Sequence, residues 1–472
     1  MKKKVISVLL SMAMVASLTA CGGGSGDTGA SDSAGDAAAT EDTTEDSAPA
    51  DDAAAADDSA AGEEAAVTEG ASADDNTLTV WTWDPNFNVY AMEKAGEIYA
   101  QDHEGFKVEV SEVLSEDIET RITTAVSAGD LSTLPDIFLM QDNSFQKYVI
   151  NYPDVFTDLT SSGINFGDFS AAKVAYSTID GKNYGIPFDN GAVINCVRTD
   201  ILEQAGFTVD DFTDITWSDY MEKAKVVLEK TGVPMLTAQA GSPDQVMMML
   251  QSCGSSLFNE DGTVNIAGNE ELKEIMNIYV QMVKDGTLVE VTDWDQYIAS
   301  LNNGTVVSAM NGCWIMASIT PVEDQSGKWA LTNMPKLDNI AGATNYSNNG
   351  GSSWAISSNC QKVDLAVDFM NSTFAGSTAL YDDVITKGAL ATWAPAGESD
   401  AYAQPVEFFG GDAIYAKIVD FATKTPSNTT GVYYYDARDA VGVAISNICQ
   451  QGADIDSEIK TAQETVEFNM GG

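Results

Sequence analysis

The run Leu78-Thr79-Val80-Trp81-Thr82-Trp83 is an alternating β-branched and aromatic segment over its last four residues, and it is followed by the turn residues Asp84-Pro85-Asn86. This pattern predicts a β-strand that ends in a turn. The segments downstream alternate between helical and extended patterns: a helix over 90–101, a strand over 107–113, a helix over 117–128 ended by Gly129, and a strand over 135–140. A strand, helix, strand, helix, strand order predicts parallel pairing with right-handed crossovers, and therefore an α/β fold.

Polar residues follow the first and third predicted strands. Asp84 comes after the first strand, and Gln141 and Asp142 come after the third. Because the carboxyl ends of parallel strands meet at one edge of the sheet, these side chains are expected to lie together there. Open α/β sheets bind their ligands at this edge.

The amino terminus has the pattern of a secretion signal. Lys2, Lys3 and Lys4 precede an apolar stretch over 5–18, which ends in Leu18-Thr19-Ala20-Cys21. The stretch is too short to span a membrane. The motif resembles the lipobox of bacterial lipoproteins, which implies that 1–20 is a signal peptide and that Cys21 is acylated. The alternative is an ordinary signal peptide with an incidental cysteine. The lipobox reading predicts a protein on the extracellular face of the cytoplasmic membrane, held by lipid chains.

An acidic segment separates this anchor from the rest of the chain. Residues 22–75 contain 16 carboxylates, no Lys or Arg and no aromatic residue. Such a composition predicts a disordered linker over 21–75. Residues 76–472 keep a net charge of −35 out of the total of −48. This charge excludes nucleic-acid binding, and the length of this part predicts at least two lobes.

The cysteines and the single histidine give no sign of a metal or another cofactor. No pair has the spacing C-x-x-C, and the five cysteines after Cys21 are far apart: Cys196, Cys253, Cys313, Cys360 and Cys449. Isolated buried thiols are favoured over one or two disulfides. His103 beside Glu104-Gly105 is expected on the surface, and one histidine cannot make a paired metal site.

An ordered set of segments extends over nearly all of 76–472. It comprises Leu78–Trp83, Leu134-Pro135-Asp136-Ile137, Asp180-Gly181-Lys182 with Pro187, Asn195 with Thr199-Asp200-Ile201-Leu202, Thr216-Trp217 with Tyr220, Gly304 through Ala309-Met310 to Gly312 and Trp314, and the 350–357 strand before Asp364–Phe369. In its order and spacing this set resembles the extracellular solute-binding proteins of ABC importers, in the carbohydrate-binding group (family 1) that includes maltose-binding protein.

The resemblance implies a periplasmic-binding-protein-like fold of type II, with two α/β lobes, a ligand cleft and a hinge made of strands. Lobe I would comprise 76–190 and 350–395, and lobe II 191–349 and 396–472. The lobes would close around the ligand. The partners implied are a saccharide and the permease subunits of the transporter, and the protein is expected to be a monomer.

A sugar offers apolar C–H faces and a rim of hydroxyls, so its site needs aromatic planes together with amides and carboxylates. Such residues stand at the expected edges, and the resemblance matches Trp314 to an aromatic platform and Asp142 to a ligand of sugar hydroxyls. The full predicted set is Trp83, Asp84, Gln141, Asp142, Phe188, Asn190, Gln239, Trp314, Trp393, Tyr433 and Tyr434. Asp189 lies between two of its members.

Charge at these edges favours a neutral ligand. Arginine is the usual partner of acidic ligands, and the predicted edges contain none. The nearest are Arg198, beside Asp200, and Arg438, beside Asp436 and Asp439. A polyamine or another non-sugar solute is the alternative ligand.

A secreted glycosidase is the alternative from another class. It would use two carboxylates, for which Asp84 and Asp142 are available. The chain lacks nucleophile motifs such as G-x-S-x-G, so a binding protein is favoured over an enzyme.

Overall fold

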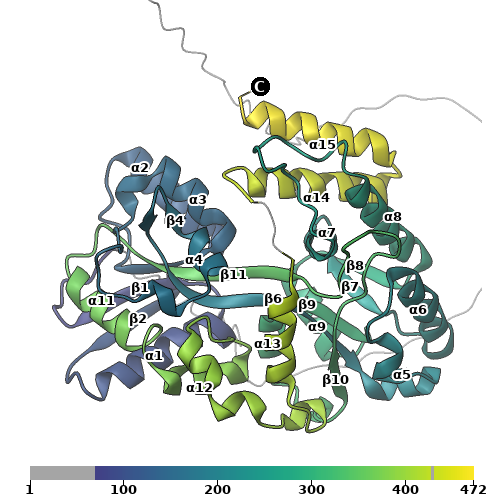
Figure 1. Ribbon diagram of the computed structural model, residues 1–472, viewed down its shortest axis with the longest axis horizontal. Coiled ribbons are helices and arrows are strands. Elements are labelled where there is room, and N and C mark those ends of the chain that lie inside the picture. Colours follow the sequence, from purple (N-terminus) through teal and green to yellow (C-terminus); the bar gives the residue numbers. More distant parts are fainter. Residues whose placement is uncertain (1–69, 427–429, 472) are drawn as a thin grey trace, which may run out of the picture. The chain divides into compact units, whose positions relative to one another are not determined.

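The computed structural model of the chain describes residues 70–426 and 430–471 (Figure 1). The predicted signal peptide, Cys21 and the linker up to residue 69 lie outside the described residues. The last predicted linker residues, 70–75, contact the folded body. The Gly70 N–H donates to the Thr133 carbonyl at 2.9 Å, and the Ser72 N–H donates to the Asp136 carboxylate at 3.2 Å.

The amino-terminal part forms the predicted parallel arrangement. The strands are β1 (Thr77–Thr82), β2 (Lys107–Glu112) and β3 (Ile137–Gln141), and the helices are α1 (Tyr90–Ala100), α2 (Ser115–Ala128) and α3 (Asp142–Asn151). β1 pairs in parallel with β2 and with β3, and Trp81 is in register with Phe138. The carboxyl ends of β1 and β3 therefore reach the same edge, as predicted.

Local signals in the sequence explain where some of the helices begin or end. α2 stops at Gly129, whose φ of 66° is a left-handed conformation that glycine adopts at little cost. α6 (Trp217–Thr231) begins after Thr216, whose side chain accepts a hydrogen bond from the Asp219 N–H.

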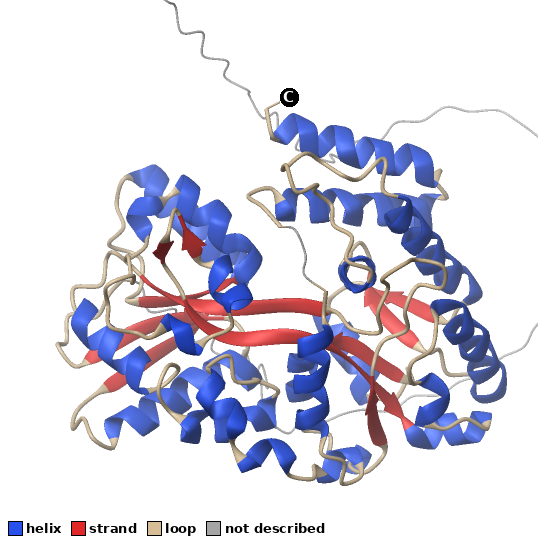
Figure 2. Cartoon of the chain, viewed as in Figure 1, coloured by secondary structure: helices blue, strands red, loops and turns tan. Residues whose placement is uncertain are grey.

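Two long strands connect the parallel part to the rest of the molecule. β6 (Ile186–Arg198) and β11 (Asn348–Ile356) pair antiparallel, and β11 also pairs antiparallel with β3. The 7-stranded sheet has the order β10-β6-β11-β3-β1-β2, and β9 pairs with β6 outside this path. Figures 1 and 2 show these strands running across the centre, with helices on both faces.

The remaining elements follow the same layered plan. The further strands are β4 (Thr178–Ile179), β5 (Lys182–Asn183), β7 (Leu236–Gln239), β8 (Leu288–Val291), β9 (Ser308–Gly312) and β10 (Trp329–Thr332). The further helices are α4 (Ala171–Tyr176), α5 (Thr199–Ala205), α7 (Asp244–Ser252), α8 (Glu270–Asp285), α9 (Trp294–Asn302), α10 (Met316–Ile319), α11 (Val363–Ser372), α12 (Thr378–Val384), α13 (Ile414–Lys424), α14 (Tyr434–Gln451) and α15 (Ile455–Asn469).

The buried side chains form separate hydrophobic clusters. Two clusters are built mainly from 78–188 and 354–396, and a third is built from 193–337 with α14 and α15. A fourth draws residues from β6, β9, α13 and the segment around Leu390. Among the described helices, none is long and apolar enough to cross a membrane.

The described cysteines are free thiols, as the sequence favoured. Cys196, Cys313 and Cys360 are buried, and Cys253 and Cys449 are half-buried. His103 is exposed, with its Nδ1 2.9 Å from the Tyr99 carbonyl.

Candidate functional site

The carboxyl end of β3 continues directly into α3, and this junction carries Gln141 and Asp142. The Asp142 side chain is 5% exposed. Its Oδ1 accepts a hydrogen bond from Ser353 Oγ at 2.9 Å, and its Oδ2 pairs with the Lys173 ammonium. Burial raises the pKa of Asp142 to about 6, although the neighbouring ammonium favours the ionised carboxylate. The junction thus holds a carboxylate at the sheet edge where such folds bind ligands.

A second buried carboxylate, Asp189 on β6, lies in the field of the same ammonium. It accepts hydrogen bonds from the Ser352 N–H at 2.8 Å and from Ser352 Oγ at 2.5 Å. Lys173 Nζ donates to the Ser352 carbonyl at 2.8 Å. Burial raises the pKa of Asp189, and Lys173 opposes this shift. The Lys173 ammonium therefore forms an ion pair with Asp142 and also stabilises the ionised form of Asp189, beside the paired strands β6 and β11.

β11 bends beside these charges at Gly350 and Gly351, whose φ angles are 83° and 116°. A Cβ atom on Gly351 would lie 2.6 Å from Asp142 Oδ2 and 3.3 Å from Lys173 Nζ. Both the backbone conformation and the available space require glycine at this position. The pairing of β11 with β6 is irregular in the same place.

Trp314 follows β9 and is hydrogen-bonded to β11 next to the Gly350-Gly351 bend. Its Nε1–H donates to the Asn349 carbonyl at 2.9 Å. The Asn349 side-chain amide donates to Asn311 Oδ1 at 2.8 Å, and the Asn311 amide donates to the Tyr297 hydroxyl at 3.2 Å. A chain of amides thus links the indole to the crossing strand. Trp314 is half-buried.

Trp294, at the start of α9, extends this group of rings. Its centroid is 5.8 Å from Trp314 and 5.0 Å from Tyr297, with which it is stacked at 12°. α9 follows β8, which pairs in parallel with β7. Trp294 therefore lies near the carboxyl ends of both strands.

α14 contacts α3 at its first turn. The Tyr435 hydroxyl donates to Gln141 Oε1, and Lys147 Nζ lies 3.2 Å from Asp436 Oδ2. Tyr434 is buried, and its ring meets Tyr435 edge-on at 5.3 Å. Of the three consecutive tyrosines, Tyr435 is the one bonded to a predicted site residue.

Arg438 lies one turn further along α14, beside these tyrosines. Its guanidinium is 2.5 Å from Asp244 Oδ1 and 5.7 Å from the Tyr435 ring centroid. It also approaches Asp439 at 3.6 Å. The sequence pointed to Asp436 or Asp439 as its partner, and its closer partner is Asp244. Arg198 pairs with Asp200 as expected, at 2.8 Å.

The other predicted residues of the amino-terminal part have mixed surroundings. Trp83 is half-buried, and Asp84 caps the helical turn after β1 by accepting from the Asn86 N–H at 2.8 Å. Burial raises the pKa of Asp84. Phe188 is 0% exposed and packs among Phe87, Trp354 and Phe374. Its ring has no face free for a ligand in this structure, because it points into the core side of β6.

The last four predicted residues are all half-buried. Asn190 is in register with Gly351, and Gln239 ends β7. Trp393 has a buried Nε1–H without a hydrogen-bond partner among the described residues. Tyr433 immediately precedes α14 and packs against the hydrophobic cluster of that helix.

Several residues of this region were missed by the sequence analysis. Lys173 and Tyr176 lie on the short helix α4, and Trp294, Tyr297 and Asn349 lie around Trp314. Tyr176 is close enough to Asp142 and Tyr434 for both to affect its pKa, which burial raises. A tryptophan at a helix start directly after a short strand was an available signal for Trp294.

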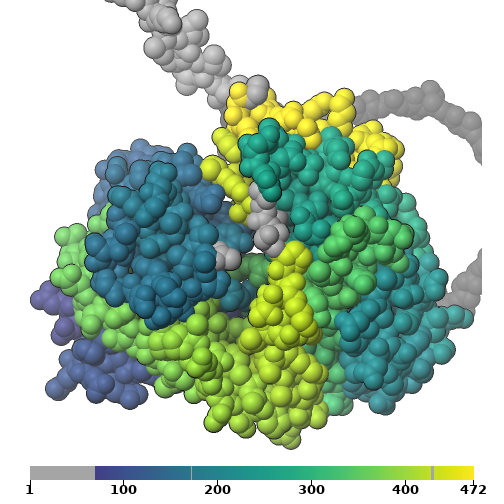
Figure 3. All heavy atoms as spheres, viewed as in Figure 1, coloured from purple at the N-terminus to yellow at the C-terminus, as the bar shows by residue number. Residues whose placement is uncertain are grey.

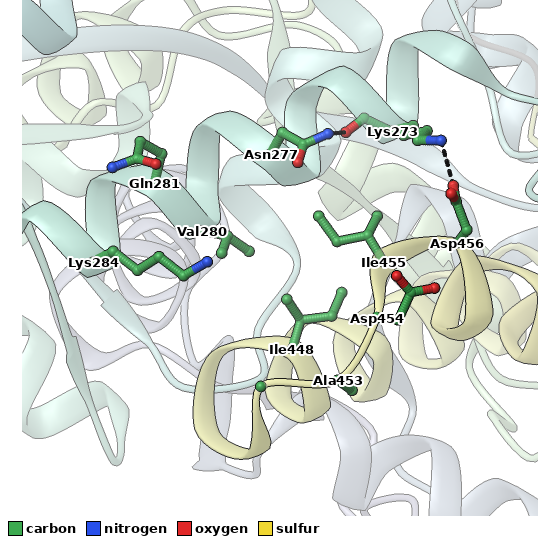
Figure 4. Close-up of a pocket in the computed structure, with 11 residues that line it drawn as sticks. Lys273, Asn277, Val280, Gln281, Lys284, Ile448, Ala453, Asp454, Ile455 and Asp456 are labelled. Carbon is green, nitrogen blue, oxygen red and sulfur yellow. Dashed lines mark hydrogen bonds and ion pairs between the residues drawn. The ribbon is translucent and has the colours of Figure 1, made fainter.

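The surface is hollowed beside this region. Figure 3 shows the hollow between the blue segment that includes α3 and α4 and the yellow α13. A separate pocket of about 490 Å³ lies between α8 and the turn from α14 to α15, with Lys273 and Asp456 paired at its rim (Figure 4). No predicted site residue lines that pocket. No cluster of three or more His, Cys, Asp or Glu side chains within 70–426 and 430–471 could hold a metal ion.

The chain belongs to the bacterial extracellular solute-binding protein family, whose family model matches residues 94–409. A lactose-binding protein of Rhizobium radiobacter is 36% identical over 82% of this chain and 91% of its own. An arabinooligosaccharide-binding protein of Halalkalibacterium halodurans is 23% identical over 75% of this chain and 80% of its own.

Solved structures of the same fold cover most of the chain. An ABC-transporter-associated binding protein from B. animalis subsp. lactis, in complex with β-1,6-galactobiose, matches with a TM-score of 0.71 at 20% identity, over 82% of this chain and 96% of that one. Maltose-bound MalE3 of T. maritima matches with a TM-score of 0.69 at 17% identity, over 83% and 99%. These findings confirm the predicted family and the predicted periplasmic-binding-protein-like fold of type II.

Proposed function

We propose that this protein is the extracellular binding component of an ABC importer, anchored through Cys21, and that it captures a neutral sugar or oligosaccharide for delivery to the permease. Family membership supports the binding role. The relatives named for lactose and for arabino-oligosaccharides support a sugar ligand. They are binding proteins, which also supports the absence of catalysis.

The observation that carries the proposal is the group of rings and amides around Trp314. Trp294 and Trp314 are half-buried and can offer aromatic planes, and the half-buried Asn349 stands beside them with a planar amide. Tyr297 and Asn311 are buried and support these groups from behind, by stacking on Trp294 and by a hydrogen bond to Asn349. Aromatic planes suit the apolar faces of a pyranose, and amides suit its hydroxyls. Gln141 and Asp142 would add polar groups from the other side.

The charges near Tyr434 and Tyr435 support a neutral ligand. Arg438 is the arginine beside these rings, and Asp244 pairs with it at 2.5 Å. A guanidinium that already holds a carboxylate is a poor partner for an acidic sugar. Lactose and related galactosides are the first candidates, since the lactose-binding relative is 36% identical.

Ligand capture would occur by closure of two lobes, 76–190 with 350–395 and 191–349 with 396–472. The separate hydrophobic clusters on either side of the crossing strands support this division. β6 and β11 would act as the hinge, and the bend at Gly350-Gly351 is a suitable place for rotation.

Calorimetric titration of the purified full chain tests the proposal. The panel comprises lactose, β-1,6-galactobiose, arabino-oligosaccharides, maltose, a uronic acid and spermidine. We expect a neutral saccharide to bind and to raise the melting temperature, because it binds the folded state alone. Binding of spermidine without binding of any sugar would support the polyamine alternative, and accumulation of cleaved product would support a glycosidase.

Lipid attachment is tested separately in a bacterial host that processes lipoproteins. An alkynyl fatty acid should label the wild-type chain and leave Cys21→Ser unlabelled. Equal labelling of both would contradict the predicted anchor.

A further inference from the structure

The charged group at the carboxyl end of β3 has an unusual composition. The Lys173 side chain is 3% exposed and that of Asp142 is 5% exposed, and Asp189 is 2% exposed. The group therefore holds one cation and two acidic side chains almost out of contact with water. Burying ionised groups is costly unless each is paired and hydrogen-bonded.

Lys173 is the member that links the others. Its ammonium pairs with Asp142 at the start of α3 and donates to the Ser352 carbonyl of β11 at 2.8 Å. The Ser352 N–H and hydroxyl in turn donate to Asp189 on β6. One side chain on α4 thus connects the helix that begins at the candidate site with both crossing strands.

The neighbouring residues restrict the position of the Asp142 side chain. Lys173 lies on one side of its carboxylate and Ser353 on the other. Gly351 approaches the Asp142 carboxylate so closely that even a methyl group would clash. A carboxylate held at both oxygens and against a fixed backbone is preorganised, which lowers the cost of binding a hydroxyl.

We propose that Lys173 is a positioning residue of the sugar site, which acts through Asp142 by fixing that carboxylate against the Gly350-Gly351 bend of β11. This inference rests on the proposed function. Lys173 itself is not required to touch the ligand.

A double-mutant cycle on sugar affinity tests the coupling. The variants are Lys173→Met, Asp142→Asn and the double variant, each titrated with the sugar that binds the wild type most tightly. We expect each single variant to bind at least tenfold more weakly. The double variant should bind no more than threefold more weakly than Asp142→Asn, because Lys173 acts through that carboxylate. Independent, multiplicative losses would overturn the inference.

The double variant also keeps the test decisive if Lys173→Met fails to fold, since it removes one charge of each sign. In that case the inference is tested by comparing the sugar affinity of the double variant with that of Asp142→Asn. Lys362→Met is the matched control, because Lys362 lies beside Asp136 at the other end of β3 with its side chain 11% exposed. The Lys362→Met variant should be less stable than the wild type, and the folded variant should bind sugar with wild-type affinity.

The pH profile of affinity separates positioning from mere structural support. The groups around Asp142 are Lys173 and Tyr176 on α4, Asp189 on β6, and Ser353 on β11. Lys173 favours the ionised form of Asp142, so affinity should fall on acidification at a higher pH in Lys173→Met than in the wild type. An unchanged midpoint would contradict the inference.

The wild-type titration distinguishes the two proposals. If no sugar binds the wild type, both the proposed function and this inference fail. If a sugar binds the wild type and Lys173→Met binds it equally well, the inference alone fails.

Discussion

The two ends of β3 each carry a buried aspartate that faces a lysine, and the surroundings of the two differ. At the amino end, Lys362 Nζ lies 3.5 Å from Asp136 Oδ2 and donates to three backbone carbonyls, at 2.7, 2.8 and 3.1 Å. Asp136 accepts from the Thr79 N–H at 3.0 Å. At the carboxyl end, Asp142 and Asp189 depend on Lys173.

The difference lies in charge balance and in location. The amino end has one carboxylate for one ammonium, and it fastens β1 and the residues before it to β3. The carboxyl end has a surplus of carboxylate, and it lies where the crossing strands meet the candidate site. A balanced pair is what structural support requires, whereas a surplus charge beside a ligand edge indicates a role in binding. Changes at the amino end should therefore lower stability and leave sugar affinity unchanged, whereas changes at the carboxyl end should weaken sugar binding.

The largest effect is expected for Asp136→Asn. This change leaves the Lys362 ammonium, 11% exposed, without a carboxylate. Loss of one partner of a buried pair should lower the free energy of unfolding by about 3 kcal/mol. Urea denaturation measures this loss, and calorimetry of the folded variant should show wild-type sugar affinity. Weakened binding in the folded variant would remove the distinction between the two ends.

For Asp142→Asn the expected effect is a change in how stability depends on pH, because burial raises the pKa of the aspartate that the change removes. The pKa of Asp142 is raised to about 6 in the folded state. An acid whose pKa is raised by folding contributes stability that is complete below its unfolded pKa of about 4 and is lost as the pH rises through about 6. The difference in unfolding free energy between variant and wild type should thus shift by about 2 kcal/mol in favour of the variant between pH 4 and pH 7. A difference that stays constant over this range would count against a raised pKa of Asp142 in the folded state.

Trp314→Ala tests the ring group that lies near the carboxyl end. Removal of a buried aromatic anchor should weaken sugar binding by about 2 kcal/mol. The variant should lose some stability and remain folded without sugar, since the ring is half-buried and packs at the edge of two hydrophobic clusters. Trp314→Phe is the control: it keeps a ring and loses the hydrogen bond to the Asn349 carbonyl, so its loss should be smaller. Wild-type affinity in the alanine variant would exclude Trp314 from the site.

Much of the fold could be predicted from local patterns. The alternation in 78–83 and the order of strands and helices up to Met140 predicted the parallel pairing of β1, β2 and β3. Gly129 marked the end of α2. These signals are local, because hydrophobic periodicity and caps act within a few residues.

The candidate site could be predicted only in part. Asp142 and Gln141 were predicted because they directly follow a strand, and Trp314 because it follows β9 and matches the family resemblance. The structure brings Asp142 and Trp314 to the Gly350-Gly351 bend, and their role in binding stays a prediction. Phe188 was included, yet its ring is in the core, since neighbouring residues of a strand face opposite sides and the sequence does not say which side is which. Lys173 was missed, because α4 is short and its partner lies 31 residues away.

The class of fold and the family followed from residue patterns along the chain, and the same patterns predicted the edge of the sheet at which a ligand would bind. The folded structure was needed to show that Lys173 pairs with Asp142 near Asp189, that Arg438 pairs with Asp244, and that Trp294 lies beside Trp314. These pairings involve residues far apart in sequence, and charge and ring contacts depend on distances that only the folded chain sets.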